Sequence, residues 1–327
     1  MTIPPSGDEF EIRSGNQRAT IVEVGGGIRE YFADDRAVLD PYPIEAMCDG
    51  AHGAPLIPWP NRLGDGRYRF DGIDHQVALT EPEKHNAIHG LLRWRPWSVL
   101  EREHARVKMG TRLFPMEGYP FLLDVQVEYA LSQDGLRVVT TATNLGDGPC
   151  PYGAGQHPYL SPGPGLLDQC TLDLGAETRI VTDPERQLPV GAESVRGTPF
   201  DFRGGKLLGT LRVDFAFTGL ARDASGRAWV RLTGPDGWRA ELWVDQSYPI
   251  IEIYTGDTLA APRRRRGLGT EPMTCPPNAF QSGEGVIRLE PGQAITTTWG
   301  ARLTRVPPST ALEQSGAPGA VSNSGPE

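Results

Sequence analysis

The sequence predicts an all-β protein of antiparallel strands, arranged as a sandwich or a barrel. Three observations support this fold class. The chain has 40 glycines and 30 prolines among 327 residues, too many turn-forming residues for a protein of long helices. Apolar and polar residues alternate with a period of two in several segments, as they do in half-buried strands. Turn signals separate these segments at short spacing, which favours hairpins over alternating strands and helices.

Two hairpins are predicted in the first half of the chain. Residues 68–77 surround Asp71-Gly72, a dipeptide that is typical of tight turns. Residues 123–131 alternate between apolar and mostly polar side chains, Asp134-Gly135 provides a turn, and residues 136–142 alternate again. We expect one face of this longer ribbon to lie in a core and the other to face solvent.

A third hairpin is expected near the C-terminal end, where residues 286–289 and 295–299 flank Pro291-Gly292, a pair that favours a type II turn. Helix signals are weak. Residues 97–109 contain no glycine or proline but have mixed periodicity, and we interpret them as strand. Gly25-Gly26-Gly27 lacks the spacing of a dinucleotide-binding loop and no helix pattern follows it, which excludes a Rossmann site.

We predict a single domain, residues 1–305, and a disordered tail, residues 306–327, that is rich in Ser, Gly and Pro. The net charge of −9 argues against nucleic acid or an anionic membrane as partner. No apolar stretch is long enough for a membrane-spanning helix and the N-terminal residues do not resemble a secretory signal, so we expect a cytoplasmic protein. Its four isolated cysteines should be reduced and mostly fill the core: Cys48, Cys150, Cys170 and Cys275.

Two histidines have a setting that suits acid–base chemistry. His89 belongs to the segment 86–90, which we expect to be a loop with small residues that let a ligand approach the backbone. His157 lies between glycines and Pro158, next to Tyr159, so its imidazole is a candidate for a pre-positioned acid or base.

Two carboxylates are unusual by context. Glu271 lies in residues 269–278, which contain prolines and no other charge and which we expect to form a stiff loop. Burial there would raise its pKa and make it a better base. Asp214 is flanked by apolar residues and therefore needs a partner, either a ligand hydroxyl or an arginine.

Asn61 and Arg62 follow Pro58-Trp59-Pro60. Arginine beside tryptophan offers forked donors and an aromatic face, both of which sugars use, although core packing is the commoner role for Trp59. The run Arg263–Arg266 is either a solvated loop or a phosphate-binding segment. His85 and His89 have the spacing of a metal pair on a helix, but no helix is expected there and no further ligands stand out, so we predict no metal.

Several segments, in order along residues 55–303, resemble the aldose 1-epimerase (galactose mutarotase) family, as a divergent branch of it. The matching pieces are Pro60-Asn61-Arg62-Leu63 with Gly66, Tyr68, Phe70 and Gly72; Asn86-Ala87-Ile88-His89-Gly90; Gly118-Tyr119-Pro120-Phe121; Asn144; His157-Pro158-Tyr159; Asp214 with Phe217; Tyr254-Thr255-Gly256; and Glu271 with Pro276-Pro277-Asn278-Ala279.

The resemblance implies a large antiparallel two-sheet β-supersandwich and an enzyme that interconverts the anomers of an aldose without cofactor or metal. It also implies site roles: Glu271 as general base, His157 as general acid, His89 as a second active-site histidine, and Arg62 and Asp214 as residues that hold sugar hydroxyls, with Asn61 and Tyr159 beside them. The expected partner is a free aldose or a sugar phosphate, and the expected oligomeric state is a monomer or homodimer.

Three alternatives stay open at this point. A hexose-6-phosphate 1-epimerase is favoured by the arginine run, Arg263–Arg266. A non-catalytic carbohydrate-binding domain would share the fold, although the presence of His89, His157 and Glu271 together argues against it. The third alternative is a cupin-like metal enzyme, which would require a ligand set that the spacing of the residues does not provide.

Overall fold

The computed structural model describes residues 3–161 and 163–306, and most of its regular structure is β-strand. All pairings between its named strands are antiparallel, so the predicted fold class is confirmed. The regular helices among the described residues are α1 (Ala279–Ser282) and two short 3₁₀ segments, η1 (Pro82–Lys84) and η2 (Leu167–Gln169). The predicted tail lies outside the described residues, apart from Val306.

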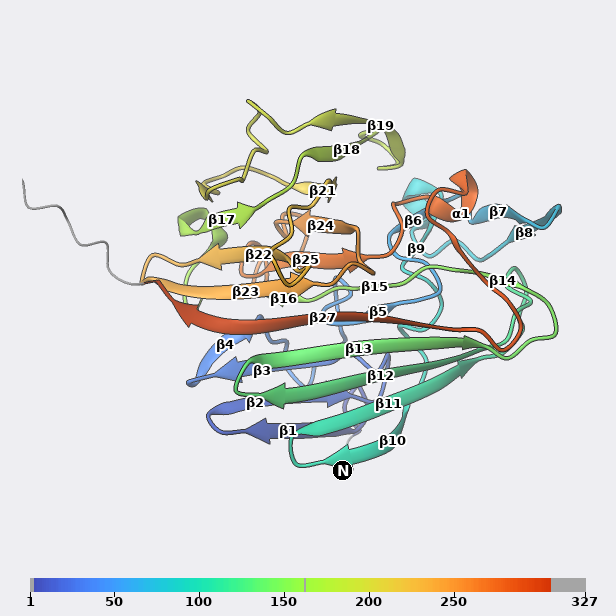
Figure 1. Ribbon diagram of the computed structural model, residues 1–327, viewed down its shortest axis with the longest axis horizontal. Coiled ribbons are helices and arrows are strands. Elements are labelled where there is room, and N and C mark those ends of the chain that lie inside the picture. The colour runs from blue at the N-terminus through green and yellow to red at the C-terminus, as the bar shows by residue number, and fades with distance from the viewer. Residues whose placement is uncertain (1–2, 162, 307–327) are drawn as a thin grey trace, which may run out of the picture.

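Two large sheets make up the structure (Figure 1). The larger has the order β1 (Glu9–Ser14), β2 (Gln17–Val22), β3 (Ile28–Ala33), β4 (Arg36–Leu39), β16 (Tyr159–Leu160), β25 (Leu268–Met273), β24 (Ile250–Tyr254), β21 (Asp214–Thr218), β18 (Thr178–Thr182) and β19 (Pro189–Ser194), with β15 (Gly155–Gln156) and β5 (Pro55–Leu56) joined beside β25. The second has the order β10 (Ser98–Glu103), β11 (Arg106–Leu113), β12 (Leu123–Ser132), β13 (Gly135–Asn144), β27 (Ala294–Arg305), β23 (Trp238–Val244), β22 (Ala228–Thr233), β17 (Thr171–Leu174) and β20 (Lys206–Leu207).

Three small two-stranded sheets complete the fold: β14 (Cys150–Tyr152) with β26 (Ile287–Leu289), β6 (Arg62–Gly64) with β9 (Asn86–Ile88), and β7 (Arg67–Phe70) with β8 (Ile73–Gln76). In Figure 1 these small sheets lie toward one end of the large sheets, on the right of the view. One of them carries Arg62, and His89 follows its second strand.

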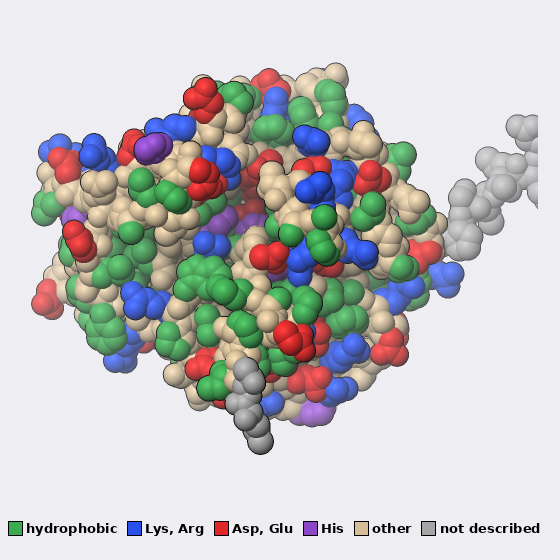
Figure 2. All heavy atoms as spheres, turned by 180° about the vertical axis from the view of Figure 1, so that it is seen from behind, with side chains coloured by type: hydrophobic (Ala, Val, Ile, Leu, Met, Phe, Trp, Pro, Cys, Tyr) green, Lys and Arg blue, Asp and Glu red, His purple; other side chains and the backbone are tan. Residues whose placement is uncertain are grey.

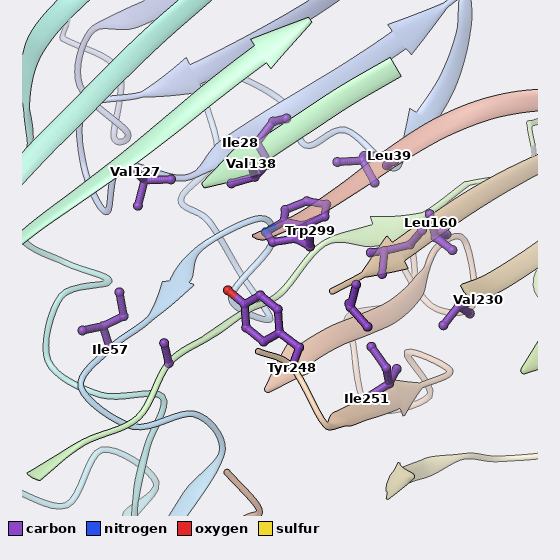
Figure 3. Close-up of a cluster of buried hydrophobic side chains, with 14 of the residues drawn as sticks. Ile28, Leu39, Ile57, Val127, Val138, Leu160, Val230, Tyr248, Ile251 and Trp299 are labelled. Carbon is purple, nitrogen blue, oxygen red and sulfur yellow. The ribbon is translucent and has the colours of Figure 1, made fainter. Parts of the chain in front are cut away.

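The core fills the space between the two large sheets. In β12, buried residues alternate strictly with half-buried ones until the exposed last residue, as the period-two pattern predicts. Figure 3 shows side chains from both sheets meeting there, among them Val127 and Val138 from the second sheet and Ile251 from the larger. Trp299 of β27 is fully buried, and its indole Nε1 donates to the side-chain oxygen of Gln156 at 3.1 Å. This hydrogen bond ties the two sheets together directly behind residue 157.

The two hairpins expected in the first half of the chain are confirmed as β7–β8 and β12–β13. Residues 97–109 are mostly strand, as interpreted, but a turn at residues 104–105 divides them between β10 and β11, which pair as a hairpin. The third hairpin is wrong, because β26 pairs with β14 and β27 pairs with β13 and β23. The turn at Pro291-Gly292 does form, but Gly292 and Gln293 hydrogen-bond to the backbone of Asn144, so the chain leaves the small sheet there and enters the large one.

Other expectations from the sequence have simple outcomes. The four cysteines are free, and Cys150, Cys170 and Cys275 are buried as expected of core residues, whereas Cys48 is only partly buried. Within residues 3–161 and 163–306, no helix combines the length and apolar character needed to span a membrane.

Candidate active site

A cavity of about 510 Å³ gathers most of the residues that the sequence singled out. Its lining includes Asn61, Arg62, Glu81, Glu83, Lys84, His89, Arg93, His157, Tyr159, Gln187, Asp214, Tyr254 and Glu271. On the face of the molecule drawn in Figure 2, histidine and acidic side chains lie at the bottom of a hollow near the centre. The structure therefore brings together all seven predicted site residues, although they are as far as 210 positions apart in the chain (Asn61 to Glu271).

Three neighbouring strands of the larger sheet, β21, β24 and β25, supply the acidic side of the site. Asp214 pairs with Tyr254, and Glu252 pairs with Glu271. Because directly opposed residues share a face of a sheet, these side chains all project from the face that is turned away from Ile251 and Ile253 of the core. The expectation that Glu271 lies in a loop is wrong: it lies in β25, where all six residues are buried.

The misassignment of Glu271 has a physical cause. Proline in a central strand normally argues against that strand, because it cannot donate to the ladder. Here the neighbouring chain leaves the ladder between β15 and β16, so Pro272 lies near a gap instead of a full partner strand. The gap contains His157 and Pro158, and the Pro158 carbonyl accepts a hydrogen bond from Thr270 N–H at 2.8 Å. The same interruption thus tolerates the proline and places a histidine beside Glu271.

His157 and Glu271 contact each other directly. The distance between His157 Nε2 and Glu271 Oε1 is 3.0 Å, and both side chains are at most 5% exposed. Burial raises the pKa of Glu271 well above its ordinary value, with Glu252 and Asp214 adding to the effect. Burial lowers the pKa of His157 well below its ordinary value, helped by His52 and Arg93. Both directions disfavour the ion pair and favour a neutral pair, in which the carboxyl group holds the proton beside a neutral imidazole.

His89 is held by the backbone of Asn61. The Asn61 N–H donates to His89 Nδ1 at 3.2 Å, and the His89 N–H donates to the Asn61 carbonyl at 2.9 Å. Because Nδ1 accepts, the ring proton of neutral His89 lies on Nε2. Burial lowers the pKa of His89 well below its ordinary value, and Arg93 and His157 add to the effect.

The segment 86–90 is only partly the loop that we expected. Asn86–Ile88 forms β9, which pairs with β6, and the loop begins at His89 with a positive φ of 63°. Gly90 follows with φ of 70°, and a Cβ atom there would lie 2.1 Å from the carbonyl oxygen of Ile57. Only glycine fits this position, which turns the chain directly after the histidine.

The residues expected to hold sugar hydroxyls are themselves tied to neighbours. Arg62 donates from Nε and one terminal nitrogen to the two oxygens of Glu81, at 2.8 and 3.0 Å. Asp214 accepts from the Gln187 side chain at 2.6 Å, and the Tyr159 hydroxyl donates to the Gly50 carbonyl at 2.8 Å. These bonds fix the side chains in place and leave the remaining donors and acceptors for a ligand.

Two functional candidates were missed from the sequence. Glu252 is 3% exposed, and burial followed by the charge of Asp214 raises its pKa to about 8. Its signal was a single acid in the apolar run Ile250–Tyr254, the same kind of signal that identified Asp214. Arg93 lines the cavity, and its guanidinium has no ion pair or hydrogen bond with any described residue. Burial lowers the pKa of Arg93. No sequence pattern distinguishes it from its neighbour Arg95.

The run Arg263–Arg266 does not reach this cavity. Arg263 forms ion pairs with Asp40 and Asp49, and Arg265 forms ion pairs with Asp168 and Asp257. None of the four arginines lines the cavity. Arg263 and Arg265 join loops of the fold, and Arg264 and Arg266 bond to carbonyls of their own loop, so the feature that favoured a phosphate at the site is lost.

His89, His157 and Glu271 are also a set of donors that could surround a metal ion, since their ligand atoms lie within 4.8 Å of one another. A divalent ion would have to replace the His157–Glu271 hydrogen bond, and Arg93 places a positive charge near all three groups. The arrangement fits proton transfer better than metal binding. A carboxyl and an imidazole that share one proton can take a proton from one oxygen of a bound ligand and give one to another.

Comparison with known proteins agrees with the fold and identifies the family. The family model described as aldose 1-epimerase matches residues 8–301. An uncharacterized protein of Escherichia coli K12, YihR, is 34% identical over 290 residues, which cover 88% of this chain and 91% of that protein. The aldose 1-epimerase of the same organism is 28% identical over 249 residues, 67% of this chain and 66% of that enzyme.

Solved structures show the same fold at low sequence identity. An aldose epimerase homologue from C. elegans has a TM-score of 0.81 and 19% identity, with 91% of this chain and 99% of that chain covered. Galactose 1-epimerase from Lactobacillus acidophilus has a TM-score of 0.75 and 19% identity, with coverage of 91% and 94%. The expected galactose mutarotase-like β-supersandwich is therefore confirmed.

Proposed function

Since the chain belongs to the aldose 1-epimerase family, we propose that it interconverts the α and β anomers of an aldose by acid–base ring opening and reclosure. The observation that carries the proposal is the contact of Glu271 with His157 at the wall of the cavity. Anomerisation needs one group to take the proton of the anomeric hydroxyl and another to protonate the ring oxygen. A buried carboxyl–imidazole pair with one shared proton supplies both.

In the proposed reaction, the Glu271 carboxylate takes the proton from O1 while His157 Nε2 gives its proton to O5. The C1–O5 bond breaks, and C1 becomes an aldehyde carbon. After rotation about C1–C2, the O5 hydroxyl attacks the other face of the aldehyde, His157 regains its proton, and Glu271 returns one to O1. The starting protonation state forms when the shared proton moves along the 3.0 Å hydrogen bond from Glu271 to His157.

The neighbouring residues have positioning roles in this proposal. His89 offers its Nε2 proton to a sugar oxygen, because Nδ1 is occupied by Asn61. Arg62 and Asp214, fixed by Glu81 and Gln187, hold hydroxyls and keep the open aldehyde aligned for reclosure. Each well-placed acid or base contributes roughly 10²–10⁴ in rate.

A sugar phosphate is the second candidate substrate. The arginine run no longer supports it, but Arg93 lines the cavity without an anionic partner among the described residues. A phosphate would supply that partner, since arginine binds phosphate oxygens through paired donors.

Polarimetry tests both candidates. Freshly dissolved α-anomers of glucose, galactose and other free aldoses are compared with glucose 6-phosphate, each with wild type and with Glu271→Gln. Glu284→Gln, at an exposed position, is the matched control. We expect wild type and the control to accelerate equilibration of at least one sugar, and Glu271→Gln to lose most of that rate. A protein that binds sugars and accelerates none of them would be a binding domain instead.

A further inference from the structure

The imidazole of His157 lacks the contact that usually orients a histidine in an active site. Such rings are commonly fixed by a hydrogen bond from the second nitrogen to a carboxylate or a carbonyl. His157 Nε2 contacts Glu271, but Nδ1 is buried and has no hydrogen-bond partner among the described residues. Beyond the contact with Glu271, the ring plane must therefore be set by packing contacts.

Stacking supplies those contacts. The rings of His157 and Tyr159 are nearly parallel, with centroids 4.9 Å apart and an interplanar angle of 13°. The rings of Tyr159 and His52 are closer still, 3.7 Å apart at 5°. We call these three rings, His52, Tyr159 and His157, the stacked column. His89 meets the ring of His157 edge-on, at 5.3 Å and 77°.

The outer end of the stacked column is anchored away from the cavity. His52 is 3% exposed and does not line the cavity. Its Nε2 lies 3.1 Å from Asp40 Oδ2 and 2.7 Å from a terminal nitrogen of Arg263, and Arg263 also pairs with Asp40 at 3.2 Å. The middle ring is fixed too, since the Tyr159 hydroxyl donates to Gly50.

The backbone joins the same segments. Gly53 N–H donates to the His157 carbonyl at 2.8 Å, and His157 N–H donates to the Ala54 carbonyl at 3.1 Å. The loop that carries His52 is thus bound to residue 157 through its backbone and to residue 159 through the His52 ring. Arg263, one residue of the basic run, holds the far end of this assembly.

We propose that His52 is a positioning residue, which acts through Tyr159 to hold the ring of His157 in the plane needed for proton transfer. Stacking replaces the missing hydrogen bond at Nδ1. The proposal rests on the proposed function, in which His157 Nε2 gives a proton to the ring oxygen. A ring free to rotate about its Cβ–Cγ bond would lose that alignment without losing sugar contacts made by other residues.

Substitutions of His52 separate stacking from the hydrogen bonds. His52→Phe keeps a flat ring and removes the bonds to Asp40 and Arg263, whereas His52→Leu fills similar volume without a flat ring. We expect kcat within threefold of wild type for His52→Phe and about tenfold lower for His52→Leu, with KM within threefold for both. The matched control is His75→Leu, because His75 also stacks on a tyrosine, Tyr68, at 4.9 Å, but outside the cavity. It should leave kcat unchanged.

A second measurement does not need turnover. In protein with isotope-labelled histidine, the ring signals of His157, assigned by their absence in His157→Asn, should broaden in His52→Leu and stay sharp in His52→Phe. Equal kcat values for the Phe and Leu variants, or a change in KM alone, would overturn the proposal. If wild type anomerises no sugar, the proposed function fails, and the NMR comparison still decides whether His52 holds the ring.

Discussion

Glu252 and Glu271 face each other across β24 and β25, and both carboxyl groups are buried. Each also has one oxygen without a hydrogen-bond partner among the described residues. Two opposed carboxylates cannot both ionise cheaply in such a place, so their environment must keep at least one of them protonated near neutral pH. Glu252 lies outside the cavity lining and Glu271 inside it, so the electrostatics of the base depend on a residue that no ligand needs to touch.

Glu252→Gln should make folding stability less sensitive to pH. The pKa of Glu252 is raised to about 8 in the folded protein, so this state holds a proton that the unfolded chain releases above its ordinary value of 4.5. Stability from this group is complete below 4.5 and is lost as pH rises toward 8. The glutamine amide cannot ionise, so the melting temperature of Glu252→Gln should exceed that of wild type by about 2 °C or more at pH 8.5. Thermal unfolding between pH 5 and 8.5 measures this. If the melting temperatures of the two proteins change with pH in parallel, Glu252 does not hold the proton in the folded state.

Glu271→Gln should keep the fold and lose most anomerisation. The substitution is nearly isosteric and removes the basic oxygen, and a positioned base is worth roughly 10²–10⁴ in rate. Polarimetry with the best substrate measures the rate, and calorimetry measures sugar binding, which we expect to persist. A rate within about threefold of wild type, well short of the tenfold that 1.4 kcal/mol represents, would remove Glu271 from the mechanism.

The pH profile should be a bell whose two limbs belong to the His157–Glu271 pair. Activity requires one proton on the pair, so the rate falls at low pH when a second proton binds and at high pH when the last one leaves. From unperturbed values alone, the carboxylate would set the acid limb and the imidazole the alkaline limb, between roughly pH 4.5 and 8. In the folded protein the raised pKa of Glu271 and the lowered pKa of His157 exchange these assignments, so the imidazole corresponds to the acid limb and the carboxyl group to the alkaline limb.

His157→Asn should convert the bell into a simple rise. With no imidazole to protonate the ring oxygen, kcat should drop at least tenfold, and the remaining activity should need only ionised Glu271. The midpoint of the rise should lie above the ordinary carboxyl value of 4.5, because burial and the nearby acids raise the pKa of Glu271. His89→Asn should cost less and keep both limbs. If the alkaline limb is lost in His89→Asn and remains in His157→Asn, then His89 is the general acid and His157 is not.

Chelation should leave activity unchanged. The donor set His89, His157 and Glu271 is better suited to proton transfer, because its closest contact is already a hydrogen bond and Arg93 lies nearby. Dialysis against a strong chelator followed by polarimetry checks this. Activity that disappears and returns with one divalent ion would replace the acid–base account with a metal-assisted one.

The fold could be predicted because strands and turns have sequence patterns that are recognisable within a short segment. Period-two alternation and Asp-Gly turns determine which residues face the core and where a ribbon reverses, and both act within about ten residues. The hairpin expected around Pro291-Gly292 was wrong because a turn specifies a reversal but not the partner strand. Which strand becomes the partner depends on Asn144, which lies far away in the sequence and whose backbone hydrogen-bonds to Gly292 and Gln293 of the turn.

The site was predicted less completely for a related reason. His157, Glu271 and Asp214 carry local signals, and their resemblance to family motifs added roles. Arg93 and Glu252 depend on contacts across strands and loops, such as the register of β24 with β25, which no short window contains. The basic run was misinterpreted because a run of charges in a sequence does not reveal their partners. Arg263 and Arg265 are neutralised by four acids, of which two lie in the β4–β5 connection, one in η2 and one in the same connection as the arginines.

The gap between β15 and β16 means that the larger sheet cannot be fully regular and still carry the site. Residues 157 and 158 lie outside the regular ladder of a twelve-stranded sheet, and the imidazole of His157 turns toward Glu271 there. Their backbone groups are still hydrogen-bonded, to Gly53, Ala54 and Thr270. Replacing residues 157 and 158 with two β-branched residues that continue a regular strand would be expected to remove the imidazole from Glu271 and abolish proton transfer. A more regular sheet at this point is therefore incompatible with the site, and a heat-resistant variant that keeps the site has to gain its stability elsewhere.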